Sequence, residues 1–312
     1  MNYGYLVQRL LLALLVIFGV SVVVFLIVQL VPGDPARVVL GVQADEQSVN
    51  AMRERMGLNR PLLEQYTSWI TGVIRGDFGN SLITAQSVSE QLGNRLIPTV
   101  QLALAALTVG LFIAFPLGII SAMYPHSWVD VLASLISQIG VSIPDFWMGI
   151  LLILLFSLTL GWLPPSGYAG LDEGFGDWLS HIILPAFTAG LISGSIQTRF
   201  IRSAMLEVLN ANYIRTAHAK GLRHGVVLTR HALRNAMITI VTIIGLQMTA
   251  LFSAVVVVEI VFAWPGLGQL SLNAVLDRDY PLLQGAVLTL AIIVTLINLL
   301  VDMAYFFLDP RI

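Results

Sequence analysis

The chain contains no cysteine, and only 11% of its 312 residues carry a charge. Without cysteine it has no disulfide bond, no thiolate metal site and no cysteine nucleophile. Soluble domains usually have about 25% charged residues, so the low charge content argues against a soluble enzyme. The net charge of −2 offers no basic excess for binding nucleic acid, and a hydrophobic share of 57% excludes a disordered chain. This composition is typical of an all-α protein that crosses a membrane several times.

Lysine is nearly absent as well. The only lysine is Lys220, and it follows Ala219. A phosphate-binding loop needs the sequence Gly-Lys-Ser or Gly-Lys-Thr, so we do not expect this chain to hydrolyse ATP. The sequence also has no His-Glu-x-x-His pair. We therefore expect no catalytic residue, no metal site and no cofactor bound by this chain.

Six apolar stretches are long enough to cross a bilayer, which takes about 20 residues in a helix. They are residues 10–31, 96–123, 131–160, 181–204, 236–262 and 282–307. The first is too long for a signal peptide and has no small-residue cleavage site after it, so we interpret it as a permanent anchor. Pro144 and Gly149 interrupt the third. In the fourth, Gly190 and Gly194 have the spacing that lets a neighbouring helix approach closely, although an ordinary contact between small residues is the preferred interpretation.

Charge placement predicts how these stretches are oriented. Residues 199–234 contain seven basic side chains and one acidic one, whereas residues 163–180 contain three acidic side chains and no basic one. Basic loops stay in the cytoplasm, so the segment between the fourth and fifth stretches is predicted to face inward. Six spans then place both termini in the cytoplasm and the long segment 32–95 outside.

The outside segment is predicted to fold. Asp45 is placed to begin a short helix that runs through Met56, and Pro61 to begin an amphipathic helix that ends before residues 76–79. The apolar face of the second helix consists of Leu62, Leu63, Tyr66, Trp69, Ile70 and Val73. That face is either a lid on the outer ends of the spans or a docking surface for a soluble partner, and the sequence leaves both interpretations open.

Asp145 is an ionisable residue inside the third apolar stretch. A carboxylate in a membrane is costly and is a functional candidate for that reason. Pro144 can kink the helix just before it, and at 1.5 Å per residue Asp145 lies roughly 20 Å from the inner end of the stretch. We therefore predict a substrate path formed by Asp145, Phe146 and Trp147. The alternative is a hydrated carboxylate at the outer interface.

The basic inner segment predicts two short helices. Residues 213–220 are compatible with a helix that Gly221 would end, and residues 226–235 are compatible with a second one. Two helices joined by a glycine-containing turn form a rigid projection at the membrane surface. The alternative is a basic amphipathic surface held on anionic lipid.

This inner segment resembles the EAA loop of ABC-importer permeases, which reads Glu-Ala-Ala-x3-Gly-x9-Ile-x-Leu-Pro. Ala217, Gly221 and Leu233 match that pattern in register. Four positions depart from it, namely Arg215, Thr216, His231 and Arg234. These departures match the subfamily of dipeptide, oligopeptide, glutathione and nickel permeases. Five further segments agree with that subfamily in order along the chain: residues 31–36, 76–79, 258–268, 278–281 and 308–312.

The resemblance implies a type I ABC-importer-like permease of six transmembrane helices in a bacterial or archaeal plasma (inner) membrane. It implies three parts, which are the first span (1–31), an external loop with short helices (32–95), and a five-helix core (96–312) that contains a cytoplasmic coupling loop (205–235). The implied partners are a second homologous permease that completes a heterodimer, two ATPase subunits that bind ATP and magnesium, and an external solute-binding protein.

The resemblance also implies which residues couple the permease to its ATPases. They are Tyr213, Arg215, Thr216, Ala217, Lys220, Gly221 and Arg223. Ala217 and Gly221 would allow tight seating because neither has a large side chain, while Arg215, Lys220 and Arg223 would make polar contacts.

The cargo is less defined than the family. Short peptides are the favoured cargo, and a nickel chelate or glutathione remains an alternative within the same family. Two alternatives belong to other functional classes. A secondary transporter without ATPases would need an ion site, and Asp145 alone is weak evidence for one. A membrane-embedded enzyme would need a catalytic constellation that the sequence does not contain.

Overall fold

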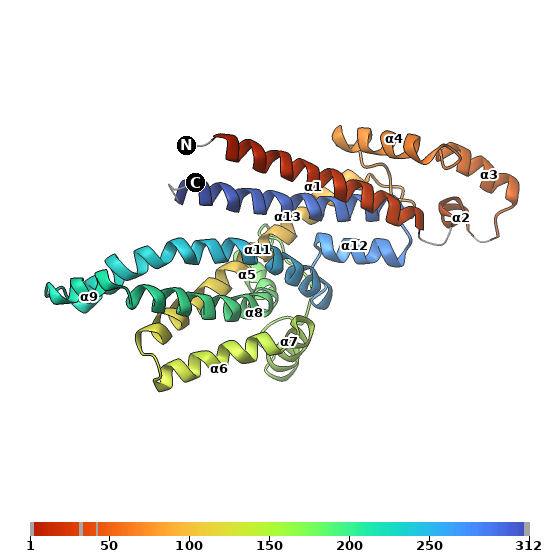
Figure 1. Cartoon of the computed structure of the whole chain (residues 1–312). Helices are drawn as coiled ribbons and strands as arrows, with labels where there is room; N and C mark the ends of the chain where they lie inside the picture. The colour runs from red at the N-terminus through yellow and green to blue at the C-terminus, as the bar shows by residue number, and fades with distance from the viewer. Residues whose placement is uncertain (1–2, 31–33, 42, 309–312) are drawn as a thin grey trace. The chain divides into compact units, whose positions relative to one another are not determined.

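The computed structural model describes residues 3–30, 34–41 and 43–308. These residues form helices in chain order and no strand, apart from one isolated bridge between Asn80 and Ser87. The helices, of which η1 and η2 are π-helical, are α1 (Tyr3–Leu30), α2 (Pro35–Leu40), α3 (Glu46–Arg55), α4 (Leu62–Ile74), α5 (Val88–Met123), α6 (Trp128–Ser142), α7 (Asp145–Leu152), η1 (Ile153–Thr159), α8 (Phe175–Leu209), α9 (Asn212–Ala219), α10 (His224–Val226), η2 (Val227–Leu233), α11 (Arg234–Val261), α12 (Leu267–Leu276) and α13 (Tyr280–Leu308) (Figure 1).

Five of the six predicted spans are confirmed as long apolar helices. By length and composition, α1, α5, α8, α13 and the continuous helix His224–Val261 can each cross a membrane. The third span is wrong as a single helix, because the chain bends by 105° between α6 and the helix Asp145–Thr159. Ile143 and Pro144 between them have extended backbone conformations, with ψ angles of 125° and 144°. A proline disfavours the helical conformation in the residue before it and lacks an N–H for the helix ladder.

The prediction of a second short helix at 226–235 is also wrong. Residues 224–226, 227–233 and 234–261 are consecutive parts of one helix that runs into the fifth span. No proline or glycine stands between His231 and Val241 to end it, so the change from polar to apolar side chains at this point does not mark a helix boundary.

The described chain divides into two compact units. The first contains residues 100–264 with short stretches from both ends of the chain, and the second contains residues 6–99 and 265–296. In the first unit, α6, α7 and α11 all pack against α8.

Two glycines of α8 lie against the backbone of α5 in the first unit. A Cβ atom added to Gly194 would stand 2.7 Å from the backbone oxygen of Gly110, and one added to Gly190 would stand 2.7 Å from that of Ala106. Because backbone atoms form the other wall, this approach is possible only with glycine. The structure therefore shows a close approach at Gly190 and Gly194, where an ordinary contact between small residues was the preferred interpretation.

In the second unit, α4 packs on α1 through aromatic side chains. Tyr66 meets Phe25 edge to face with 5.5 Å between ring centroids, and Trp69 lies 6.1 Å from the same ring. The Tyr66 hydroxyl also lies 2.8 Å from that of Ser21. Leu62 and Leu63 are exposed, so only the later part of the predicted apolar face is covered.

The two helices predicted between residues 45 and 76 are otherwise confirmed. The first begins after Asp45 and ends at Arg55, although the Asp45 side chain makes no capping hydrogen bond. The second begins directly after Pro61. Gly76 and Gly79 then adopt positive φ angles of 81° and 83°, which glycine tolerates without strain.

Candidate functional site

The helix α9 is fixed to the first unit by one apolar face. Ile214 and Ala217 are three residues apart, which places them on the same side of a helix, and both are buried. They belong to a buried cluster with Met205 of α8 and with Val227 and Ala232 of η2. The segment is therefore a rigid projection between α8 and the long helix that follows it (Figure 1).

The opposite face of α9 and the turn after it are exposed and basic. Arg215, Thr216, Lys220, Gly221 and Arg223 all lie on this surface. Gly221 ends the helix with a φ angle of 76°, as predicted from its identity. The structure therefore brings these five predicted residues together on one surface.

Two further predicted residues of this segment contact the protein's own helices, although Tyr213 is 44% exposed. The Tyr213 hydroxyl accepts a hydrogen bond of 2.9 Å from the side chain of Asn235, which ties α9 to the beginning of α11. Ala217 is only 7% exposed. Its small side chain therefore packs against the protein's own helices, and its contact with a partner stays a prediction.

An ion pair that the sequence analysis missed lies near the same end of α8. The Arg202 guanidinium binds the Asp130 carboxylate through two bonds, Nε to Oδ1 at 2.7 Å and Nη2 to Oδ2 at 2.8 Å. The Ser121 hydroxyl and the His126 backbone N–H, at 2.9 Å, also donate to this carboxylate. The Asp130 side chain is only 8% exposed. The pair therefore clamps the end of α5 and the start of α6 onto α8.

A cavity of about 190 Å³ lies among α7, α8 and α11. Its polar lining consists of Asp145, Ser193 and Gln247. Its apolar lining consists of Ala189, Ile192, Ile196, Ala250, Leu251 and Ala254. The sequence analysis singled out Asp145 but missed Ser193 and Gln247 as its neighbours.

The structure separates the three residues of the predicted substrate path. Asp145 is the first residue of α7 and lines the cavity. Phe146 and Trp147 are about half exposed, at 50% and 49%, and neither lines it. Asp145 also does not lie within a continuous span, because the chain bends directly before it. Of the three predicted residues, only Asp145 lines this cavity. That all three line a substrate path stays a prediction.

The loop that precedes α8 is tied to the same unit by Tyr168. Its hydroxyl donates to the Gln101 side chain at 3.3 Å, and its ring meets that of the buried Trp264 edge to face at 4.8 Å. Burial raises the pKa of the Tyr168 hydroxyl above its ordinary value of 10.0, and the nearby Asp172 and Glu173 carboxylates raise it further. The phenol is therefore neutral at physiological pH and acts as a donor.

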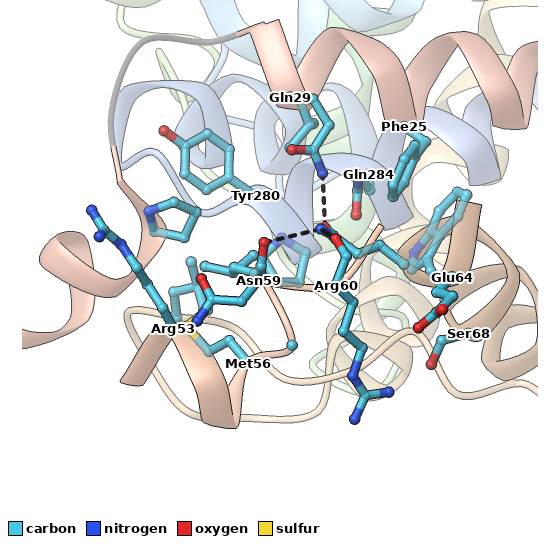
Figure 2. Close-up of a pocket in the computed structure, with 18 of the residues that line it drawn as sticks. Phe25, Gln29, Arg53, Met56, Asn59, Arg60, Glu64, Ser68, Tyr280 and Gln284 are labelled. Carbon is cyan, nitrogen blue, oxygen red and sulfur yellow. Dashed lines mark hydrogen bonds between the residues drawn. The ribbon is translucent and has the colours of Figure 1, made fainter. Parts of the chain in front are cut away.

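The second unit contains a larger cavity of about 690 Å³ on the segments that the sequence places outside (Figure 2). Its lining is polar and carries both signs of charge. Arg53 forms an ion pair of 2.8 Å with Asp34. The Gln29 side chain donates to Gln65 at 3.3 Å, and Gln65 donates to the Arg60 backbone oxygen at 2.8 Å. The second unit therefore has a concave polar surface in addition to the contact between α4 and α1.

Two family models match the chain and together cover most of it. Residues 114–312 match the model of the binding-protein-dependent transport system inner membrane component. Residues 2–103 match the N-terminal model of the corresponding membrane component.

Curated relatives match over nearly the full length. The glutathione transport system permease protein GsiC of Escherichia coli K12 is 40% identical over 309 residues, which cover 99% of this chain and 98% of the relative. The dipeptide transport system permease protein DppB of Alkalihalophilus pseudofirmus is 38% identical over 329 aligned positions, with 99% of each chain covered.

Solved structures show the same fold at much lower identity. One chain of the MetNI methionine ABC transporter in an inward-facing conformation superposes with a TM-score of 0.58 at 18% identity, over 70% of this chain and 96% of that one. A chain of an amino acid ABC transporter superposes with a TM-score of 0.53 at 14% identity, over 72% and 95% of the two chains. These likenesses support the predicted all-α permease fold and carry no information on cargo.

Proposed function

The chain belongs to the family of binding-protein-dependent transport system inner membrane components, and from that premise we propose that it forms half of the path by which an ATP-driven importer carries short peptides. The coarser part of this statement follows directly from the family: the chain is a multi-pass permease subunit of an ABC importer. The cargo, the coupling surface, the stoichiometry and the orientation are the proposal.

Short peptides are the proposed cargo because of the two relatives reported above. One is named for dipeptides and the other for glutathione, which is itself a tripeptide. Both names thus describe small molecules with amide bonds, a free amino group and carboxylates. A permease that is about equally similar to both is expected to accept this class.

The observation that carries the proposal is the position of α9. It is a short helix whose apolar face is fixed by Ile214 and Ala217, while Arg215, Lys220 and Arg223 remain exposed. We assign the exposed surface, with Thr216 and Gly221, to contact with an ATPase subunit. Because α9 is continuous through short connections with α8 and the helix His224–Val261, a displacement of α9 moves two spans together.

The remaining partners follow from the same assignment. Two ATPase subunits bind ATP and magnesium, and a second homologous permease completes a heterodimer. A solute-binding protein docks on the external segment 32–95, where the cavity in the second unit offers a concave polar surface. We assign α9 and both termini to the cytoplasm, and the basic segment 199–234 supports this orientation.

The proposal is tested by uptake of labelled dialanine or glutathione into cells that express the chain with its neighbouring genes. We expect uptake to require this chain, to stop when ATP is depleted, and to persist when a protonophore collapses the proton gradient in cells with maintained ATP. Uptake that stops with the protonophore and continues without ATP would contradict the proposal and indicate a secondary transporter.

A further inference from the structure

The cavity among α7, α8 and α11 has the size of one small group of atoms. Its volume is about 190 Å³, and one water molecule takes about 30 Å³ of liquid. The cavity can therefore hold an amino group with a short apolar body, but not a whole tripeptide.

The bend before α7 places Asp145 in the wall of this cavity. Asp145 is the first residue of α7, four residues before Gly149. A Cβ atom on Gly149 would stand 3.1 Å from the side chains of both Val261 and Phe262, and 3.5 Å from Thr188 of α8. One turn after Asp145, α7 is thus in close contact with α8 and with the end of α11, so Asp145 is held in place.

The lining matches the chemistry of a primary ammonium group. Asp145, Ser193 and Gln247 bring a carboxylate, a hydroxyl and an amide oxygen, all of which accept hydrogen bonds. No basic side chain lines the cavity, and Asp145 forms no ion pair with another residue in the described part of the chain. An ammonium group has three donors and no acceptor, so these three acceptors match its donors in number. The Ser193 hydroxyl also accepts a hydrogen bond of 3.1 Å from the Gln197 side chain, and its oxygen has a second lone pair for the ammonium group.

We propose that this cavity binds the primary ammonium group of the cargo, with Asp145 as the charged partner and Ser193 and Gln247 as neutral acceptors. The six apolar side chains, from Ala189 to Ala254, surround the short carbon body beside that group. This inference rests on the proposed function and narrows it, because it selects peptides with a free amino group over blocked or purely anionic ones.

The absence of native cysteine allows a direct test of the cavity's charge preference. Ser193→Cys places a single thiol of this chain in the cavity wall, and Gly176→Cys places one on the same helix at an exposed position with nothing within 4 Å of its Cβ. The assembled importer is treated with a cationic ethylammonium thiosulfonate and with the neutral methyl thiosulfonate. Modification of this chain is followed by mass spectrometry.

We expect the preference for the cationic reagent to be about tenfold greater in Ser193→Cys than in Gly176→Cys, the factor of one charge-assisted hydrogen bond. Adding Asp145→Asn to Ser193→Cys is expected to remove this preference, whereas adding Asp145→Glu is expected to retain it. Alaninamide is expected to protect the thiol at position 193, and N-acetylalaninamide, which lacks the ammonium group, is not.

Three results would overturn the proposal: equal reagent preference in the two thiol variants, a preference that survives Asp145→Asn, or no reaction of the thiol in Ser193→Cys. A cavity that holds only solvent gives the first of these results together with equal protection by both amides. The proposed function fails separately, because ATP-independent uptake contradicts it whatever the thiol shows.

Discussion

Replacing Arg202 with methionine removes the cation that pairs with a buried carboxylate. Methionine has a similar length and keeps the apolar contacts of the arginine stem, so the main loss is the charge and its two hydrogen bonds of 2.7 and 2.8 Å to Asp130. The carboxylate retains the Ser121 hydroxyl and the His126 N–H. Neither of these neutral donors supplies the missing charge.

The loss of stability depends on how deeply Asp130 is buried. Removing one partner of a buried pair destabilises a protein by about 3–5 kcal/mol. The Arg202 side chain is 31% exposed and two donors remain, so we expect the lower end, about 3 kcal/mol. Asp130→Asn is expected to cost only about 1 kcal/mol, because the Arg202 guanidinium that is left behind reaches water. The double variant is expected to be more stable than Arg202→Met alone.

The assay is thermal unfolding of the purified importer. For a large domain, a change of 1 kcal/mol in the free energy of unfolding shifts Tm by about 2–4 °C. Arg199→Met is the matched control, since Arg199 is an exposed arginine one turn earlier on α8, and little change in Tm is expected for it. If Asp130→Asn lowers Tm as much as Arg202→Met, or if the two losses add in the double variant, the clamp does not work as described.

Two further predictions concern packing and protonation. Gly194→Ala is expected to lower stability by about 1–3 kcal/mol because its Cβ meets the Gly110 backbone, whereas Gly176→Ala on the same helix, with open space around it, is expected to be neutral or slightly stabilising. Equal Tm values for these variants would contradict the close approach. Tyr168 has a raised pKa, so its contribution to stability is constant below pH 10 and is lost as the pH rises through that raised value. The phenolate absorbance of wild type minus that of Tyr168→Phe checks this, and titration at or below the ordinary pKa would contradict it.

The sequence predicted the features that depend on local pattern. The signals for these features lie within a few residues of them. They are the apolar stretches of sufficient length, the proline that begins α4 and the glycine that ends α9. The helix break at Pro144 also had a local cause. The bend of 105° could not be predicted locally, because it depends on how α7 packs through Gly149 onto α8 and α11.

The features that the sequence analysis missed depend on distant neighbours. Asp130 and Arg202 are 72 residues apart, so no local pattern pairs them. The small side chain of Ala217 is compatible with a surface contact. It is buried only because α8 and η2 lie beside it. Ser193 and Gln247 line the same cavity as Asp145 only once three helices meet.

The most direct test of the central claim is recovery of the importer from cells by a tag on this chain, with charge reversal on the two faces of the membrane. We expect wild type to recover two ATPase subunits and a second permease, and Lys220→Glu together with Arg215→Glu to lose the ATPases while retaining the second permease. Arg75→Glu, on the exposed end of α4, is the matched control and is expected to recover both. Recovery of the wild-type chain alone, or equal recovery of the ATPases by every variant, would contradict the assignment of α9 as the surface that couples this permease to ATP hydrolysis.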